Sequence, residues 1–303
     1  MKTSPPSIRI LSTGAALLLA ALSAHASADF LYVANNVGNS IEVFTPGGVG
    51  SVFASSGVSA PAGVAFDVAG NLYVANIGSN TITKFTLGGV ASVFASSGVS
   101  SPRDLAFDTA GNLYVANLGN DTIGMFTPGG VPSVFASSGL NDPYGLAFDS
   151  AGNLFVANNG DNTIVKFTPG GVGSLFTTVV GGGGLVAVAI DSTDNVYAAN
   201  NGFGTIEKFT PGGVGSPFAS SGLAGPLDLA FDNAGTLYAA NSLDNTITEF
   251  TPGGVDSVFA SAGLNFPAFL TFGPAPVPEP ATGALLALGF PALLGLRWRT
   301  RTS

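Results

Sequence analysis

The chain has 303 residues, of which 46% are hydrophobic and only 9% charged, and its formal net charge is −9. It has no cysteine, which excludes disulfide bridges and thiolate chemistry, and a single histidine, His25, which lies outside the repeated region of the chain. The many glycines and prolines, with abundant Val and Phe, predict short strands joined by tight turns.

Residues 1–28 have the three parts of a signal peptide. Lys2 and Arg9 precede an apolar run over residues 15–22, and Ala26-Ser27-Ala28 is the small-residue pattern that a signal peptidase accepts. We expect cleavage before Asp29, so that His25 is removed. A membrane anchor is the alternative, but the apolar run is short for a hydrocarbon layer of roughly 30 Å.

Residues 29–273 consist of six copies of one unit. The phrase Leu-Tyr-Val-Ala-Asn, altered in some copies, recurs about every 41 residues and ends at Asn35, Asn76, Asn117, Asn158, Asn200 and Asn241. Each full unit holds four apolar runs of four to six residues between Gly or Asn turns, and such runs are typical of strands. Six units of four strands predict an all-β fold, a six-bladed β-propeller with four-stranded blades.

The ends of the repeat predict how the ring closes. The first copy begins at Asp29 with its second strand and lacks the Ala-Phe-Asp strand that opens the later copies. Residues 268–272 supply a matching strand after the sixth copy. We expect this segment to pair with residues 31–35 and complete the first blade, whereas an open solenoid would need caps at both ends.

The unit resembles NHL repeats. In the second copy Gly63, Ala65 and Asp67 are followed by Gly-Asn-Leu-Tyr-Val-Ala-Asn over residues 70–76 and by an Ile-Thr-Lys-Phe strand over residues 82–85. The resemblance implies a six-bladed propeller whose Ala-Phe-Asp strands line the axis, without naming a function. Thr or Ser stands before the Ile, where many NHL units have Arg, so the basic surfaces of RNA-binding relatives are not expected.

Residues that recur in every unit are expected to serve the fold. One aspartate per unit precedes an Ala-Gly-Asn type of turn, where its side chain can accept backbone N–H bonds; these are Asp67, Asp108, Asp149, Asp191 and Asp232. A ring of calcium ligands is the alternative. We interpret the aspartates and the repeated asparagines as capping groups, and predict no cofactor, with calcium left as an open possibility.

Candidate site residues are those in which one unit differs from the others. The differences gather where one blade leads into the innermost strand of the next, at one mouth of the channel, and include Asp142, residues 181–184, Phe266 and Phe269. From this group Arg103, Asp104, Tyr144 and Asp228 are the candidate ligand-binding residues, because a guanidinium, an aromatic ring and carboxylates suit a sugar or a small cation. Ordinary variation of loops is the alternative.

Catalysis lacks support in the sequence. Asp104 and Asp228 could act as acid and base, but sequence does not fix their separation. Lyases of resembling folds use histidine, which the mature chain would lack. Lactonases use a metal held by Glu, Asn and Asp, whereas Glu42, Glu207 and Glu249 fall on outer-strand positions of their units.

The C-terminal part predicts sorting at the membrane. Residues 274–280 are a Pro-rich linker ending in Pro278-Glu279-Pro280, and residues 281–303 hold an apolar stretch and a basic tail with Arg297, Arg299 and Arg301. This order resembles the PEP-CTERM signal, which implies recognition and cleavage by an exosortase after transient anchoring by a transmembrane segment. A plain C-terminal anchor is the alternative.

Charge and the two ends together favour an exported protein of the cell envelope, at the cell surface or secreted after processing. Residues 29–276 hold 4 basic and 17 acidic residues, a net charge of −13, which makes nucleic acid an unlikely partner. The leading hypothesis is a non-enzymatic binding or structural module for an exopolysaccharide or an envelope protein. The alternative is a metal-dependent, lactonase-like hydrolase acting on sugar derivatives at the channel mouth.

Overall fold

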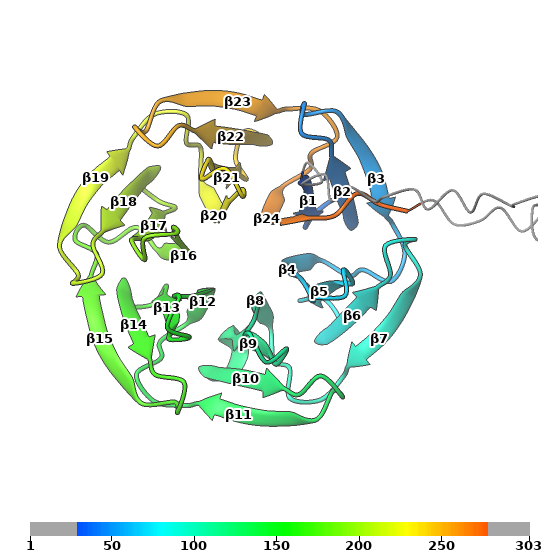
Figure 1. Cartoon of the computed structure of the whole chain (residues 1–303), viewed down its shortest axis with the longest axis horizontal. Coiled ribbons are helices and arrows are strands. Elements are labelled where there is room, and N and C mark those ends of the chain that lie inside the picture. Colours follow the sequence, from blue (N-terminus) through cyan, green and yellow to red (C-terminus); the bar gives the residue numbers. More distant parts are fainter. Residues whose placement is uncertain (1–28, 278–303) are drawn as a thin grey trace, which may run out of the picture.

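A computed structural model describes residues 29–277, which form a closed ring of six four-stranded antiparallel sheets around a central axis (Figure 1). The prediction of an all-β, six-bladed propeller is confirmed. The signal peptide, the Pro-Glu-Pro motif and the basic tail lie outside the described residues. Within residues 29–277 no helix is long and apolar enough to cross a membrane, and the helical structure there is one 3-10 turn, η1 (Leu118–Asn120).

Each blade contributes one strand to each of four concentric layers. The innermost strands are β4 (Pro61–Phe66), β8 (Pro102–Phe107), β12 (Pro143–Phe148), β16 (Leu185–Ile190), β20 (Pro226–Phe231) and β24 (Pro267–Gly273). The second layer is β1 (Phe30–Asn35), β5 (Leu72–Asn76), β9 (Leu113–Asn117), β13 (Leu154–Asn158), β17 (Val196–Asn200) and β21 (Leu237–Asn241). The third is β2 (Ser40–Phe44), β6 (Thr81–Phe85), β10 (Thr122–Phe126), β14 (Thr163–Phe167), β18 (Thr205–Phe209) and β22 (Thr246–Phe250). The outermost strands are β3 (Gly50–Ala54), β7 (Ala91–Ala95), β11 (Pro132–Ala136), β15 (Gly173–Thr178), β19 (Gly215–Ala219) and β23 (Asp256–Ala260).

The first blade is assembled from both ends of the described chain, as predicted. β24 pairs antiparallel with β1, with Leu31 opposite Phe272 and Val33 opposite Leu270. The Tyr32 hydroxyl also donates to the carbonyl of Pro274 at 2.8 Å, just beyond the closing strand. In Figure 1 β24 and β1 lie side by side in the blade where the coloured sequence begins and ends. Closure leaves every innermost strand with a neighbour on each side.

Aromatic side chains join one blade to the next. Tyr73 on β5 packs edge-on against Phe94 of the same blade and Phe107 of the following one, with ring centroids 4.9 and 5.0 Å apart. The same arrangement recurs around the ring, with Tyr32, Tyr114 and Tyr197 at the centre of equivalent groups. Both faces of each sheet are covered in this way. The second-layer strand of each sheet is therefore buried along its whole length, which explains its nearly continuous apolar sequence.

A second set of contacts between blades was not predicted from the sequence. The Asn39 side chain of blade 1 accepts a hydrogen bond from the backbone of Ala60, which precedes the innermost strand of blade 2, at 2.7 Å. Asn80, Asp121, Asn162 and Asn245 accept the equivalent bond from Ser101, Asp142, Gly184 and Phe266. We call these five bonds the interblade staples. At five of the six joints they hold the residue that enters the innermost strand in a left-handed conformation, with φ of 44° at Ala60 and 55° at Phe266.

Candidate functional site

The recurring aspartates cap the turns that follow the innermost strands, as predicted. Asp67 Oδ1 accepts from the backbone N–H groups of Ala69 and Asn71 at 3.0 and 2.8 Å. Burial works to raise the pKa of Asp67, but the bonds from Asn71 and Ala69 and the charge of Lys84 outweigh it and lower the pKa. Asp108, Asp149, Asp191 and Asp232 accept the same pair of backbone bonds. These carboxylates therefore serve the fold.

The repeated asparagines are capping groups as well. Asn76 Oδ1 accepts from the backbone of Ser59 at 2.9 Å, and its Nδ2 donates to Thr83 at 3.0 Å. Each such residue ends a second-layer strand and ties it to the connection that enters its own blade.

The four candidate residues lie on innermost strands and not in the connections where we expected them. Arg103 and Asp104 are the second and third residues of β8, Tyr144 is the second of β12, and Asp228 is the third of β20. Arg103 and Tyr144 are in contact across a blade boundary. All four residues lie within the first three positions of their strands, at the end of the propeller axis that we call the channel end. The flanking loop residues Asp142 and Phe266 do lie in connections, as do residues 181–184.

Asp104 and Asp228 occupy the same place in blades 3 and 6, on opposite sides of the ring. Asp104 accepts from its neighbour Leu105 and, across the blade boundary, from the backbone N–H of Leu146 on β12, both at 2.7 Å. Asp228 accepts from the backbone N–H of Leu270 on β24 at 2.9 Å. Each carboxylate thus binds the innermost strand of the next blade, and each residue is nearly buried, with 7% and 6% of its surface exposed.

Burial dominates the protonation of this pair. It raises the pKa of Asp104 to about 7, against the opposing effect of the two backbone bonds. Burial raises the pKa of Asp228 well above its usual value, and the negative charge of Asp104 raises it further. Two like charges at the axis are unfavourable, so the pair retains protons to higher pH than a solvated aspartate.

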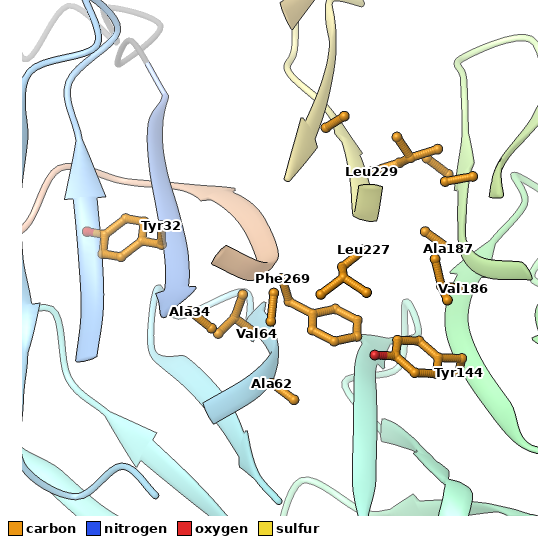
Figure 2. Close-up of a cluster of buried hydrophobic side chains, with 14 of the residues drawn as sticks. Tyr32, Ala34, Ala62, Val64, Tyr144, Val186, Ala187, Leu227, Leu229 and Phe269 are labelled. Atoms are coloured by element: carbon orange, nitrogen blue, oxygen red, sulfur yellow. The ribbon is translucent and has the colours of Figure 1, made fainter. Parts of the chain in front are cut away.

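Aromatic and aliphatic side chains fill the axis beside these carboxylates. The Tyr144 ring stacks on Phe269 of β24 with centroids 5.8 Å apart and planes 16° from parallel, and the Arg103 guanidinium lies 4.9 Å from the centroid of the Tyr144 ring. Figure 2 shows Tyr144, Phe269 and Leu227 projecting toward one another from their innermost strands. Leu227 could not be singled out from the sequence, because an apolar residue in an apolar strand carries no chemical signal.

The described residues do not fit a metal held by several carboxylates. No group of three His, Cys, Asp or Glu side chains is placed to hold an ion within residues 29–277. Glu42, Glu207 and Glu249 lie on the third-layer strands β2, β18 and β22, away from the axial aspartates. The axial aspartates direct oxygens at backbone amides.

Hollows between neighbouring blades offer a second kind of surface. One, of about 560 Å³, lies between blades 5 and 6 and is lined by Asp191, Tyr197, Lys208 and Asp232 among others. Another, of about 420 Å³, lies between blades 3 and 4 and includes Asp108 and Asp149. Both sit at the turns that the repeated aspartates cap.

The architecture defines the chain as a six-bladed β-propeller, and comparison with solved structures agrees. It is similar to a chain in the crystal structure of a nidogen/laminin complex, with a TM-score of 0.73 and 18% identity over 82% of this chain and 100% of that one. A virginiamycin B lyase from Staphylococcus aureus gives a TM-score of 0.59 and 18% identity over 69% of this chain and 73% of the lyase. A putative gluconolactonase gives 0.61 and 20% identity over 72% and 83%.

At these identities the likeness extends to the fold alone. No protein-family model matches the sequence, and no curated protein matches it either.

Proposed function

We propose that this chain is a non-enzymatic β-propeller of the cell envelope, which binds an exopolysaccharide or an envelope protein at the channel end that holds Arg103 and Tyr144. The observation that carries the proposal is that the two carboxylates at the axis are engaged in hydrogen bonds between blades. Asp104 and Asp228 accept bonds from the backbone of the next blade and are nearly buried, so they act as structural links between blades. A surface formed by the ends of six strands and their connections is well suited to a broad partner.

The proposal includes export and sorting. Residues 1–28 would direct export, and the NHL-like propeller would fold outside the cytoplasm, where lack of cysteine removes any need for oxidation. The Pro278-Glu279-Pro280 motif with Arg297 and Arg299 would be the exosortase signal, which anchors the protein transiently and leaves it at the surface or released.

A hydrolase is the second candidate, because one observation favours it. Asp104 and Asp228 form a pair with raised pKa values, a feature shared by many acid-base sites. Solved propellers of similar fold include proteins described as a lyase and a putative gluconolactonase. Hydrolysis of sugar lactones by the purified protein, abolished in an Asp104→Asn, Asp228→Asn variant that remains folded, would establish this alternative.

Binding is tested by co-sedimentation of the purified protein with the extracellular polysaccharide of its own source, with and without calcium. We expect the wild type to pellet with the polymer and an Arg103→Ala or Tyr144→Ala variant to stay in the supernatant. The matched control is Lys84→Ala, since Lys84 is paired with a turn aspartate far from the channel end. Equal pelleting of all variants would remove the channel end from the proposal, and no pelleting would redirect it to protein partners.

Sorting is tested by mass spectrometry of the exported protein from cells with and without an exosortase. We expect a shortened C-terminus that depends on the enzyme and on Glu279. Retention in the inner membrane with an intact tail would contradict the sorting proposal.

A further inference from the structure

Arg103 differs from the other cations of the described chain. Lys84, Lys166 and Lys208 each form an ion pair with a turn aspartate, at 3.5, 3.1 and 3.6 Å. Arg103, the remaining cation of residues 29–277, forms no ion pair with a described carboxylate, although Asp104 is its neighbour in sequence. In a region of net charge −13 an unpaired guanidinium requires an explanation.

The guanidinium also has an unused donor. Arg103 Nε is buried and has no hydrogen-bond partner among the described residues. A buried donor without a partner typically costs about 1–3 kcal/mol, so such a group usually meets water or a ligand. The two Nη groups at the outer end of the planar guanidinium form a fork that can bind both oxygens of a carboxylate.

The protein itself cannot easily supply that carboxylate. The side chains of Asp104 and Asp228 are fixed by the amides of Leu105, Leu146 and Leu270, which orient their oxygens toward the neighbouring strands. The Tyr144 ring lies against the guanidinium and restrains its plane, and stacking on Phe269 in turn holds Tyr144. Arg103 is therefore positioned in advance with its two Nη groups unpaired among the described residues, which lowers the entropic cost of binding.

We propose that Arg103, supported by the Tyr144 ring, forms a site for a single carboxylate group at the end of the axial channel, carried by a uronic acid or by a simple organic acid. The site takes one carboxylate and disfavours dense polyanions, because the surrounding propeller repels them. This inference names the chemical group that the proposed binding function would recognise. It rests on the proposed function only in placing the binding surface at the channel end with Arg103.

The test is calorimetric titration of the full-length protein with galacturonate, acetate and galactose. We expect galacturonate to bind and galactose, which lacks the carboxylate, not to bind. Arg103→Gln should weaken binding by about tenfold or more, since hydrogen bonds to a charged group are lost. Arg103→Lys should bind with an affinity between those of the wild type and Arg103→Gln, because lysine keeps the positive charge but cannot donate two parallel bonds. Lys84→Gln, which removes a cation of the same charge elsewhere, should leave the affinity unchanged.

The ligand series separates the two sources of the carboxylate. Binding of acetate with an affinity equal to that of galacturonate indicates a general organic-acid site, and binding of galacturonate alone indicates a uronate site. Equal binding of galactose and galacturonate, no binding of either acid, or full affinity in a folded Arg103→Gln variant would overturn the inference. If Arg103→Gln still pelleted with the polysaccharide, the proposed function would stand and this site would be rejected. If the acids bound but the protein did not pellet, this site would stand and the polysaccharide would be rejected as the partner.

Discussion

At the scale of single residues, the side chain at the third position of each innermost strand, where Asp104 stands in β8, determines how closely that strand approaches the innermost strand of the next blade. The six equivalent residues are Gly63, Asp104, Gly145, Ala187, Asp228 and Phe269. A Cβ atom added at Gly63 would lie 2.6 Å from the backbone of Arg103 and Asp104, and one at Gly145 would lie 2.8 Å from the Cα of Ala187. Small residues thus allow close contact, while the aspartates bridge to the next strand by hydrogen bonds.

The raised pKa values of the axial pair predict a pH dependence of stability. The folded protein binds these protons more tightly than the unfolded chain, where the pKa of an aspartate is about 4. The contribution of the pair is therefore fully present below about pH 4 and is lost as the pH rises toward the pKa of about 7 at Asp104. We expect Asp104→Asn to gain stability relative to the wild type between pH 5 and pH 8, by more than about 1 kcal/mol.

Urea unfolding at both pH values measures this change. The control is Asp142→Asn, whose carboxylate makes no hydrogen bond to a described residue and should follow the wild type. The turn aspartates do not mask the effect. Burial acts to raise the pKa values of Asp67 and Asp149, but hydrogen bonds and lysine charges outweigh it and lower them, so their contribution is lost only in more acidic solution. Parallel pH profiles for wild type and Asp104→Asn would show that the pair does not titrate in this range.

The close approach at Gly63 predicts a steric effect. Gly63→Ala should destabilise the protein by about 1–3 kcal/mol, because the added methyl group would push the innermost strand of blade 3 away. Gly47→Ala is the control, since its new Cβ would come no closer than 4.0 Å to another residue. Equal denaturation midpoints for the two variants would mean that the strands separate freely at this point.

At the scale of elements, the interblade staples connect the turn before the third-layer strand of one blade to the innermost strand of the next, at five of the six joints. Asn245→Gly removes the bond to Phe266, which measures 2.6 Å, and keeps the left-handed backbone, as Gly204 does at the equivalent place in blade 5. We expect a loss of about 1 kcal/mol and faster amide exchange at Phe266. Asn80→Gly offers the same test at an internal joint, where Ser101 is the donor. Unchanged exchange at Phe266 would indicate that its amide is protected by other means.

At the scale of the whole molecule, stability depends on ring closure. A chain that ends before Pro267 loses β24, and with it the partner of β1, the bond that the Leu270 amide donates to Asp228 and the Phe269 ring at the axis. We expect this truncation to expose an apolar strand edge and to give an aggregated or unfolded product. A chain ending after Val277 should fold with the circular dichroism and elution volume of the full protein. A monomeric, cooperatively folding truncation would show that blades 2 to 6 with a three-stranded first blade are stable without closure.

The sequence by itself determined the number of blades, the four strands in each and the closure by residues 268–272. It also determined the capping role of Asp67 and its equivalents, because these features follow from a fixed period and from hydrogen bonds between residues a few positions apart. The sequence also showed that four residues depart from the repeat, namely Arg103, Asp104, Tyr144 and Asp228. From it we expected them to lie in loops and to form an open site for a sugar or a cation.

Only the tertiary structure decided that these residues lie on innermost strands, that Asp104 and Asp228 bind the amides of Leu146 and Leu270, and that Arg103 is left unpaired. The physical reason for this division is that a sequence repeat determines which positions converge on the axis, but not which partners their side chains find there. Burial and the directions of individual hydrogen bonds between different blades depend on the closed ring, in which residues distant in sequence compete for the same partners.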